Sequence, residues 1–202
     1  MAVASMSDAR IRLGVFGGTF DPVHLGHLIA AQDASEAMDL DTVLFMPAFR
    51  APLKEREPGS DDARRLSFLR AAVGGDPRFD VSTLELDRGG TSFTIDTALE
   101  LRRRHPDCAL FWIIGTDQAA RLHEWRRIDE LGRLLEFIVL SRPGFELPPG
   151  GFSQSLRLHF VRAHVFDISS SEIRLRIAGG RPVRAFLPAA VADQIERDRL
   201  YR

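Results

Sequence analysis

The sequence predicts an α/β fold, with one mostly parallel sheet covered by helices on both faces. Its length of 202 residues suits a single domain. A composition of 45% apolar and 27% charged residues is that of an ordinary globular protein, and it excludes disordered, collagen-like and disulfide-scaffold classes. Short apolar runs alternate along the chain with amphipathic stretches, and this order of elements builds a parallel sheet.

Six runs rich in Val, Ile and Phe predict strands, because their length and composition suit a buried parallel sheet. These runs span residues 11–16, 42–46, 79–86, 109–114, 137–140 and 158–166. Helices are predicted over residues 25–40, 61–73, 94–105, 128–135, 170–178 and 188–197. In the second helix Leu66, Leu69, Ala72 and Val73 share one face. Such a Rossmann-like, doubly wound sheet binds ligands beyond the carboxyl ends of its strands, so the chemistry is expected just after the first strand.

Charge and composition narrow the expected partners and compartment. With 27 basic and 28 acidic residues, the chain as a whole has no field that attracts nucleic acid or an anionic membrane. The single cysteine, Cys108, excludes an intramolecular disulfide and a Cys-rich metal site. Residues 1–10 predict a flexible N-terminus without a signal peptide, ahead of one domain over residues 11–202. Because no apolar run approaches the ~20 residues of a membrane span, we expect a cytoplasmic protein without a nucleic-acid or membrane partner.

The first candidate site follows the first predicted strand, at residues 17–27 (GGTFDPVHLGH). Gly17 and Gly18 allow a tight turn and the close approach of a ligand to backbone N–H groups. His24 and His27 share one face at the start of a helix, where phosphate binds readily and imidazoles can donate to its oxygens. The motif is neither a P-loop nor a GxGxxG fingerprint. The alternatives are a turn with two ordinary surface histidines and a zinc site that lacks an evident third ligand.

The second candidate site follows the last predicted strand, at residues 168–174 (ISSSEIR). Ser169 and Glu172 fit a capping box, which is a purely structural interpretation. In the functional interpretation, the hydroxyls and amides around Ser169 and Ser170 face a polyphosphate, with Arg174 one turn along. Both interpretations can hold together. Two strand-to-helix turns of this kind on one sheet suit a nucleoside triphosphate.

Together, HxGH at residues 24–27 and ISSxxIR at residues 168–174 resemble the signatures of the nucleotidyltransferase superfamily. Within it, the chain is similar to the bacterial nicotinate-nucleotide adenylyltransferase family over about residues 11–195. Further matching blocks lie at residues 46–54, 85–97, 115–117, 122–125, 142–144 and 186–188. The chain departs from the family pattern at Leu53, where histidine is common, and more mildly at Thr91 and Phe93. Arg126 follows Trp125 where an aromatic residue is common, and this removes one stacking wall from the implied nicotinate pocket.

The resemblance implies an enzyme that transfers AMP from ATP to nicotinate mononucleotide, giving nicotinate adenine dinucleotide and pyrophosphate in NAD biosynthesis. The substrate phosphate is already an anionic nucleophile, so catalysis would consist of alignment and charge neutralisation. The implied catalytic cations or donors are His24, His27, Lys54 and Arg174, and Lys54 is the only lysine in the chain. ATP would contact Gly17, Gly18, Thr19, Phe20, Gly115, Asp117, Ile168, Ser169 and Ser170. The mononucleotide would contact Ser92, Phe93, Thr94, Trp125 and Arg142. Mg²⁺ would arrive with ATP, held by phosphate oxygens and water rather than by a resident protein site.

Other interpretations stay open from the sequence. A phosphopantetheine adenylyltransferase shares the ATP chemistry, but it usually has threonine at the position of His24. A relative that prefers nicotinamide mononucleotide is poorly separated by sequence. A nucleotide-binding sensor would bind ATP without releasing pyrophosphate. Trp125 by itself suits a core position equally well, and whether the chain forms a homo-oligomer is left open.

Overall fold

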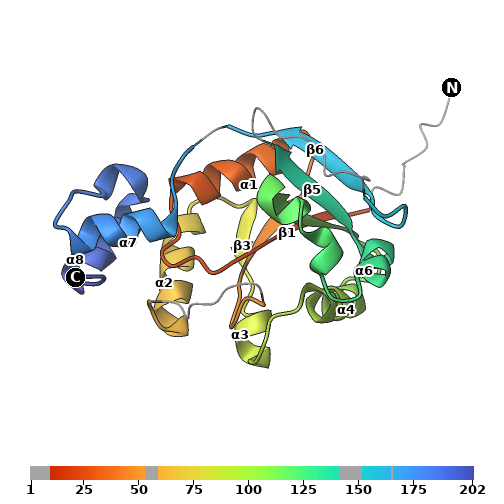
Figure 1. Ribbon diagram of the computed structural model, residues 1–202, viewed down its shortest axis with the longest axis horizontal. Coiled ribbons are helices and arrows are strands. Elements are labelled where there is room, and N and C mark those ends of the chain that lie inside the picture. The colour runs from red at the N-terminus through yellow and green to blue at the C-terminus, as the bar shows by residue number, and fades with distance from the viewer. Residues whose placement is uncertain (1–9, 53–58, 142–151, 165) are drawn as a thin grey trace, which may run out of the picture.

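The computed structural model of the protein describes residues 10–52, 59–141, 152–164 and 166–202. Within these ranges six strands form one sheet (Figure 1). The strands are β1 (Arg12–Gly18), β2 (Thr42–Pro47), β3 (Phe79–Val81), β4 (Ala109–Gly115), β5 (Glu136–Ser141) and β6 (Leu158–Arg162). The α-helices are α1 (Leu25–Ala37), α2 (Asp62–Val73), α3 (Leu84–Arg88), α4 (Thr94–Arg104), α5 (Thr116–Ala119), α6 (Ile128–Leu134), α7 (Ser170–Ala178) and α8 (Ala189–Arg197). Short 3₁₀ helices are η1 (Leu122–Glu124) and η2 (Arg184–Phe186).

All six strands run parallel, in the order β3-β2-β1-β4-β5-β6. The chain builds outward from β1 to β3, then returns to place β4 against the other side of β1. The winding therefore reverses between β1 and β4, and a binding crevice is expected beyond the carboxyl ends of these two strands. The predicted fold class, a doubly wound Rossmann-like parallel sheet, is confirmed.

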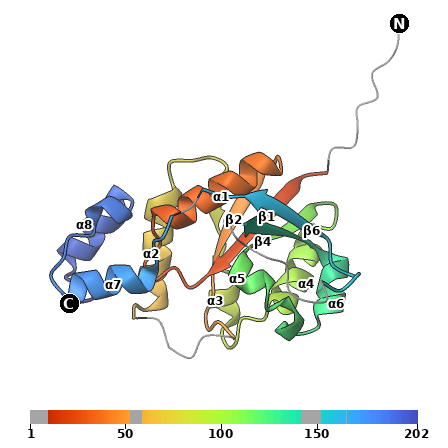
Figure 2. The same cartoon turned by 45° about the horizontal axis from the view of Figure 1, so that its top comes forward.

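The sheet is buried on both faces, because successive side chains of a strand point to opposite sides. Along β4, Phe111 and Ile113 belong to one hydrophobic core, while Leu110, Trp112 and Ile114 belong to the other. The first core is covered by α1, α2, α7 and α8, and the second by α3, α4, α5 and α6. Figures 1 and 2 show these helices on the two sides of the sheet, as the sequence predicts.

The structure corrects the strand predicted over residues 79–86. Only Phe79–Val81 forms a strand, and Leu84–Arg88 forms α3 instead. The alternation of apolar residues stops after Val81, and from Thr83 the backbone turns into helical bonds, with Asp87 N–H donating to the Thr83 carbonyl at 2.8 Å. This turn buries the Glu85 side chain, which a continued edge strand would have placed differently.

The strand predicted over residues 158–166 is shorter than expected. It ends at Arg162, whose partner is Ser141, the final residue of β5. Beyond it, the backbone N–H of His164 donates to the Asp33 carboxylate on α1 at 2.7 Å rather than to a strand. The other predicted strands and helices are confirmed with small differences at their ends, whereas α5, η1 and η2 were not predicted.

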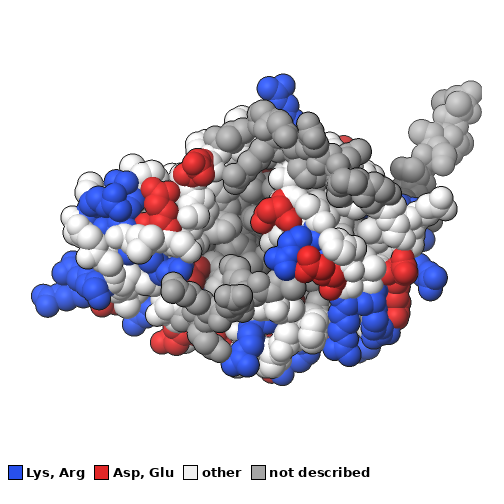
Figure 3. Space-filling model, in the orientation of Figure 1, with Lys and Arg blue, Asp and Glu red and all other residues white. Residues whose placement is uncertain are grey.

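The C-terminal helices lie at one end of the molecule. Figure 2 shows α7 and α8 there, with α8 beside α2. On the face drawn in Figure 3, acidic and basic side chains are interspersed, in keeping with the balanced charge of the sequence. In the described part of the chain, no helix has the length and apolar character needed to cross a membrane. Residues 1–9 of the predicted N-terminal segment lie outside the described residues.

Candidate active site

The first motif leaves β1 and enters α1 directly, as predicted. His24 precedes the first helical residue, and His27 lies within the first turn. The backbone N–H of His24 donates to Nδ1 of His27 at 3.2 Å, and the two ring centroids are 3.7 Å apart. Because Nδ1 of His27 accepts this bond, the proton of the neutral ring is assigned to Nε2. The His27 ring can therefore act as a hydrogen-bond donor toward an anion through Nε2.

His24 is a buried imidazole. Its residue is 5% exposed, and burial lowers its pKa from 6.5 to about 4. Among the described residues its buried Nδ1 has no hydrogen-bond partner. A Cβ at Gly26 would come within 3.1 Å of that nitrogen, so the glycine makes room for the ring. At neutral pH His24 is thus uncharged, and it can serve as a donor rather than as a cation.

We expect the native protein to lose stability as the pH falls from about 6.5 to about 4. Since the pKa of His24 is lower in the folded state, the unfolded chain takes up the proton first. The contribution of neutral His24 is therefore complete above the unfolded pKa and is lost toward the folded one, by about 3 kcal/mol. His24→Asn keeps a good N-cap residue but does not titrate. Urea unfolding of both proteins across this range should show the wild type losing stability relative to the variant, and a constant difference would contradict the assignment.

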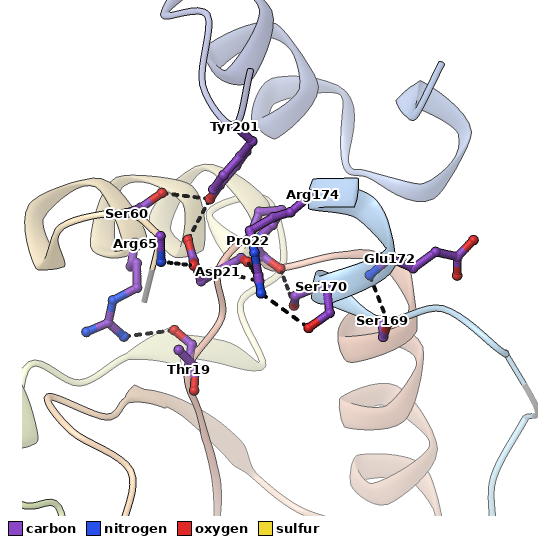
Figure 4. A network of polar contacts seen from close by, with 12 residues as sticks. Thr19, Asp21, Pro22, Ser60, Arg65, Ser169, Ser170, Glu172, Arg174 and Tyr201 are labelled. Atoms are coloured by element: carbon purple, nitrogen blue, oxygen red, sulfur yellow. Dashed lines mark hydrogen bonds and ion pairs between the residues drawn. The ribbon is translucent and has the colours of Figure 1, made fainter. Parts of the chain in front are cut away.

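The second motif is docked onto the first (Figure 4). The Arg174 guanidinium donates through Nη1 to the backbone carbonyl of Asp21 at 2.6 Å. The Ser170 hydroxyl donates to the carbonyl of Pro22 at 2.9 Å. The N-terminus of α7 is thereby fixed beside the turn that holds His24 and His27. The structure thus brings the two motifs into direct contact.

The serines of the second motif have unequal capacity for a ligand. Ser169 caps α7, because its Oγ accepts from the backbone N–H of Glu172 at 3.1 Å, which confirms the Ser169 half of the predicted capping box. Its own hydroxyl proton is still able to donate to phosphate. The Ser170 proton is committed to the Pro22 carbonyl, so its side chain offers only acceptor oxygen. Ile168 packs against the first core beside Gly26, and its side chain takes part in packing.

Asp21 is the centre of the polar network in Figure 4. It is 2% exposed, and its carboxylate accepts from the Tyr201 hydroxyl and from the Gly59 N–H, each at 2.6 Å. Nη1 of Arg174 lies 3.7 Å from the same carboxylate. The Ser60 hydroxyl in turn donates to the Tyr201 oxygen at 2.7 Å. One buried carboxylate thus joins the first motif, the segment before α2, the second motif and the segment after α8.

Tyr201 is expected to stay protonated well above the ordinary tyrosine pKa. Burial is the main cause, and its hydrogen bond to Asp21 raises the pKa further. Because the folded pKa is raised, the stabilisation is complete below about pH 10 and is lost as the pH rises beyond it. Tyr201 is the only tyrosine in the chain, so the near-ultraviolet absorbance of tyrosinate reports on it alone. Tyrosinate should appear only together with unfolding. Ionisation near pH 10 in the folded protein would contradict this contact.

Arg65 on α2 donates hydrogen bonds that hold the backbone of the first motif, a role that the sequence did not reveal. Its side chain is fully buried. Nη1 donates to the Thr19 carbonyl and Nη2 to the Ala48 carbonyl, both at 2.8 Å. Nη2 also meets the Asp62 carboxylate at 2.5 Å. The turn after β1 and the segment after β2 are therefore held by one guanidinium.

A cavity of about 530 Å³ opens at the carboxyl ends of β1 and β4. The residues predicted for the mononucleotide that line it are Ser92, Phe93, Thr94 and Trp125, and those predicted for ATP are Gly17, Gly18, Thr19 and Asp117. Trp112 forms another wall, and a Cβ at Gly17 would come within 3.0 Å of its ring, so this glycine lets the indole approach β1. The cavity also reaches Arg126, which the sequence placed at the implied nicotinate pocket. It further reaches Glu85, Gln118, Arg121 and Glu124, which the sequence did not single out as site residues.

Polar contacts fix the floor of the cavity. Ser92 Oγ accepts from the Phe49 N–H at 3.0 Å, and the Thr97 hydroxyl donates to Glu85 at 2.6 Å. Burial raises the pKa of Glu85, while hydrogen bonds from Thr97 and Ser92 and the nearby Arg88 act in the opposite direction. These contacts connect the start of α4 to the segment after β2 and to α3.

The remaining residues that the sequence predicted for the site lie in different surroundings. Gly115 ends β4, and a Cβ there would come within 2.6 Å of Asp117 Oδ1, so the carboxylate folds back against the strand end. The Phe20 side chain is 1% exposed and packs against His27 with centroids 5.0 Å apart, so ATP could meet only its backbone. Lys54 and Arg142 lie outside the described residues, as does Leu53.

Comparisons with known proteins agree in sequence and in fold. A family model described as cytidylyltransferase-like matches residues 15–176. A probable nicotinate-nucleotide adenylyltransferase of Opitutus terrae is 47% identical, covering 95% of this chain and 98% of its own. One of Shouchella clausii is 44% identical, covering 94% and 96%. The solved structure of a Plasmodium falciparum nicotinic acid mononucleotide adenylyltransferase complexed with NaAD has a TM-score of 0.77 at 16% identity, covering 94% and 97%.

Proposed function

The chain belongs to the nicotinate-nucleotide adenylyltransferases of the cytidylyltransferase-like family, and from this membership we propose how its site works. The enzyme transfers AMP from ATP to nicotinate mononucleotide, giving nicotinate adenine dinucleotide and pyrophosphate in NAD biosynthesis. One observation carries the residue-level proposal. Arg174 and Ser170 are docked onto the turn that holds His24 and His27, at the end of β1 where the cavity opens.

In the proposed reaction, an oxygen of the mononucleotide phosphate attacks the α-phosphorus of ATP. The bond between this phosphorus and the oxygen that bridges to the β-phosphate breaks, and pyrophosphate leaves with the electron pair. No protein nucleophile is needed, so the protein aligns the two phosphates and offsets their charge. The His27 Nε2–H, the Arg174 guanidinium, the Ser169 hydroxyl and the amides at Gly17 and Gly18 are the donors we assign to this task. Lys54 keeps the same proposed role from the sequence.

We further propose that Mg²⁺ enters as part of the nucleotide substrate. Among the described residues, no group of three or more His, Cys, Asp or Glu side chains could hold a metal ion. In this proposal the ion is held by triphosphate oxygens and water, which Mg²⁺ accepts readily. Bound in this way, Mg²⁺ would neutralise charge on the leaving pyrophosphate.

The cavity is proposed to receive the mononucleotide. Trp125 and Phe93 offer aromatic surface for the pyridine ring, and Ser92 and Thr94 stand at the N-terminus of α4. A helix N-terminus favours a negatively charged group, so the ring carboxylate is placed there. A cytoplasmic location remains a prediction from the sequence.

The test is pyrophosphate release from Mg·ATP with nicotinate mononucleotide, nicotinamide mononucleotide or phosphopantetheine as the acceptor. We expect release with the nicotinate acceptor to exceed release with the other two. Release with phosphopantetheine alone would leave the ATP half of the site in place and overturn the assigned acceptor pocket. ATP binding without release from any acceptor would move the protein to the class of nucleotide-binding sensors.

A further inference from the structure

Arg126 is a basic residue that lines the cavity and contacts an aromatic ring there. It follows Trp125, and its guanidinium carbon lies over the Phe93 ring, 4.7 Å from the centroid. All three side chains line the cavity. A guanidinium spread on an aromatic ring supplies a planar face, as an aromatic residue would, and adds a fixed positive charge.

The other described charged residues that line the cavity do not supply a comparable positive charge. Arg121 makes a two-pronged contact with Glu124, at 3.0 and 2.7 Å, and the two charges cancel locally. Glu85 and Asp117 are acidic. Across the described ranges of the chain, Arg126 has neither a hydrogen-bond partner nor an ion-pair partner, and its contact is with Phe93. Among the described residues that line the cavity, Arg126 is therefore the cation whose charge is left for a ligand.

The guanidinium of Arg126 lies near the N-terminus of α4, and this position favours an anionic group of the ligand. Phe93 is the residue that precedes the first turn of α4, between Ser92 and Thr94. A cation resting on Phe93 therefore lies beside the N-terminus of this helix, where the backbone already favours a negative group. The two effects add for an anionic ring substituent and are nearly absent for a neutral one.

We infer that Arg126 is a specificity-determining residue that makes the cavity prefer a mononucleotide with a carboxylate on its ring over the corresponding amide. This inference rests on the proposed function, because it assumes that the mononucleotide occupies this cavity. It goes further in assigning the acid preference partly to a side chain of this chain, in addition to the helix N-terminus. Glu85 and Asp117 would otherwise disfavour an acid by repulsion.

The experiment measures binding of nicotinate and nicotinamide mononucleotides by tryptophan fluorescence. The chain has two tryptophans, Trp112 and Trp125, and both line the cavity, so their emission reports on its occupancy. The variants are Arg126→Gln, which removes the charge but keeps a planar end, and Arg126→Lys, which keeps the charge. Arg127→Gln is the matched control, because Arg127 is the next residue, is exposed, and pairs with Glu130 outside the cavity.

We expect Arg126→Gln to lower the acid-to-amide affinity ratio about tenfold, mostly through weaker binding of the acid. Arg126→Lys should keep most of the ratio, and Arg127→Gln should keep all of it. An unchanged ratio in Arg126→Gln, with the acid still preferred by the wild type, would overturn the inference and leave the proposed function in place. If the wild type binds and turns over neither mononucleotide, the proposed function fails, and this inference fails with it.

Discussion

Replacing His27 by alanine is expected to lower kcat by about 10²–10³-fold, the usual cost of losing one donor that contacts developing charge. The reason lies in the hydrogen bond that His27 accepts from the His24 backbone, because this bond commits Nδ1 and leaves Nε2 as the donor. Steady-state pyrophosphate release at saturating substrates measures the effect. Circular dichroism and urea unfolding establish whether the variant is folded.

Two further substitutions separate the donor role of His27 from its structural role. In His27→Asn, the side-chain oxygen can still accept from the His24 N–H, so the start of α1 is preserved while the distal donor is lost. In His27→Gln, the amide nitrogen can approach the position of Nε2. We expect the asparagine variant to be stable and nearly inactive, and the glutamine variant to recover part of the activity. Activity of His27→Ala within a few-fold of the wild type would remove the phosphate-binding assignment.

The second large effect is expected on stability, from Arg65→Met. The methionine fills a similar volume but leaves the Thr19 and Ala48 carbonyls buried without their donor. The free energy of unfolding should fall by about 3–5 kcal/mol, because the two buried carbonyls lose their hydrogen-bond donor and the Asp62 carboxylate loses its cationic partner. Urea denaturation measured by circular dichroism gives this value directly.

Arg64→Met is the matched control for Arg65→Met. Arg64 is the preceding residue of the same helix, and it forms a partly exposed ion pair with Asp198. Surface pairs of this kind contribute only about 0–1 kcal/mol. Similar losses for the two variants would show that Arg65 does not hold the two segments in the way described. A folded Arg65→Met protein should also have a raised KM for ATP, because Thr19 follows the glycines of the phosphate turn.

Local signals made the first motif predictable. Gly17, Gly18, His24 and His27 lie within one strand-to-helix turn, so their spacing alone placed them together. Their meeting with the second motif was predicted by fold class, since parallel strands present their carboxyl ends at one edge. The contacts that join the motifs, from Arg174 to Asp21 and from Ser170 to Pro22, depend on side-chain geometry that spacing does not specify.

The missed residues are buried polar groups whose roles depend on distant parts of the chain. The sequence indicated a helix face with Leu66, Leu69 and Val73, whereas the structure buries Arg65 and Phe68 in place of Leu66. A basic residue next to the apolar positions was the available signal, but helical surfaces usually carry such residues. Likewise, Glu85 lay in a segment predicted as a strand. Its side chain forms hydrogen bonds with Ser92 and Thr97, which lie further along the chain. The residues next to Glu85 give no signal of these contacts.

The contact between Asp21 and Tyr201 joins residues 180 positions apart in the chain, and this separation has a consequence for synthesis. Asp21 is made early, and β1 can pair with β2 and β4 before the last helices exist. Its carboxylate gains the tyrosine hydroxyl only after β6, α7 and α8 have been translated. Folding on the ribosome can therefore complete most of the sheet while the phosphate turn still lacks its final support. The hydrogen bond between Tyr201 and Asp21 can thus form only after the strands that pair with β1 have been made.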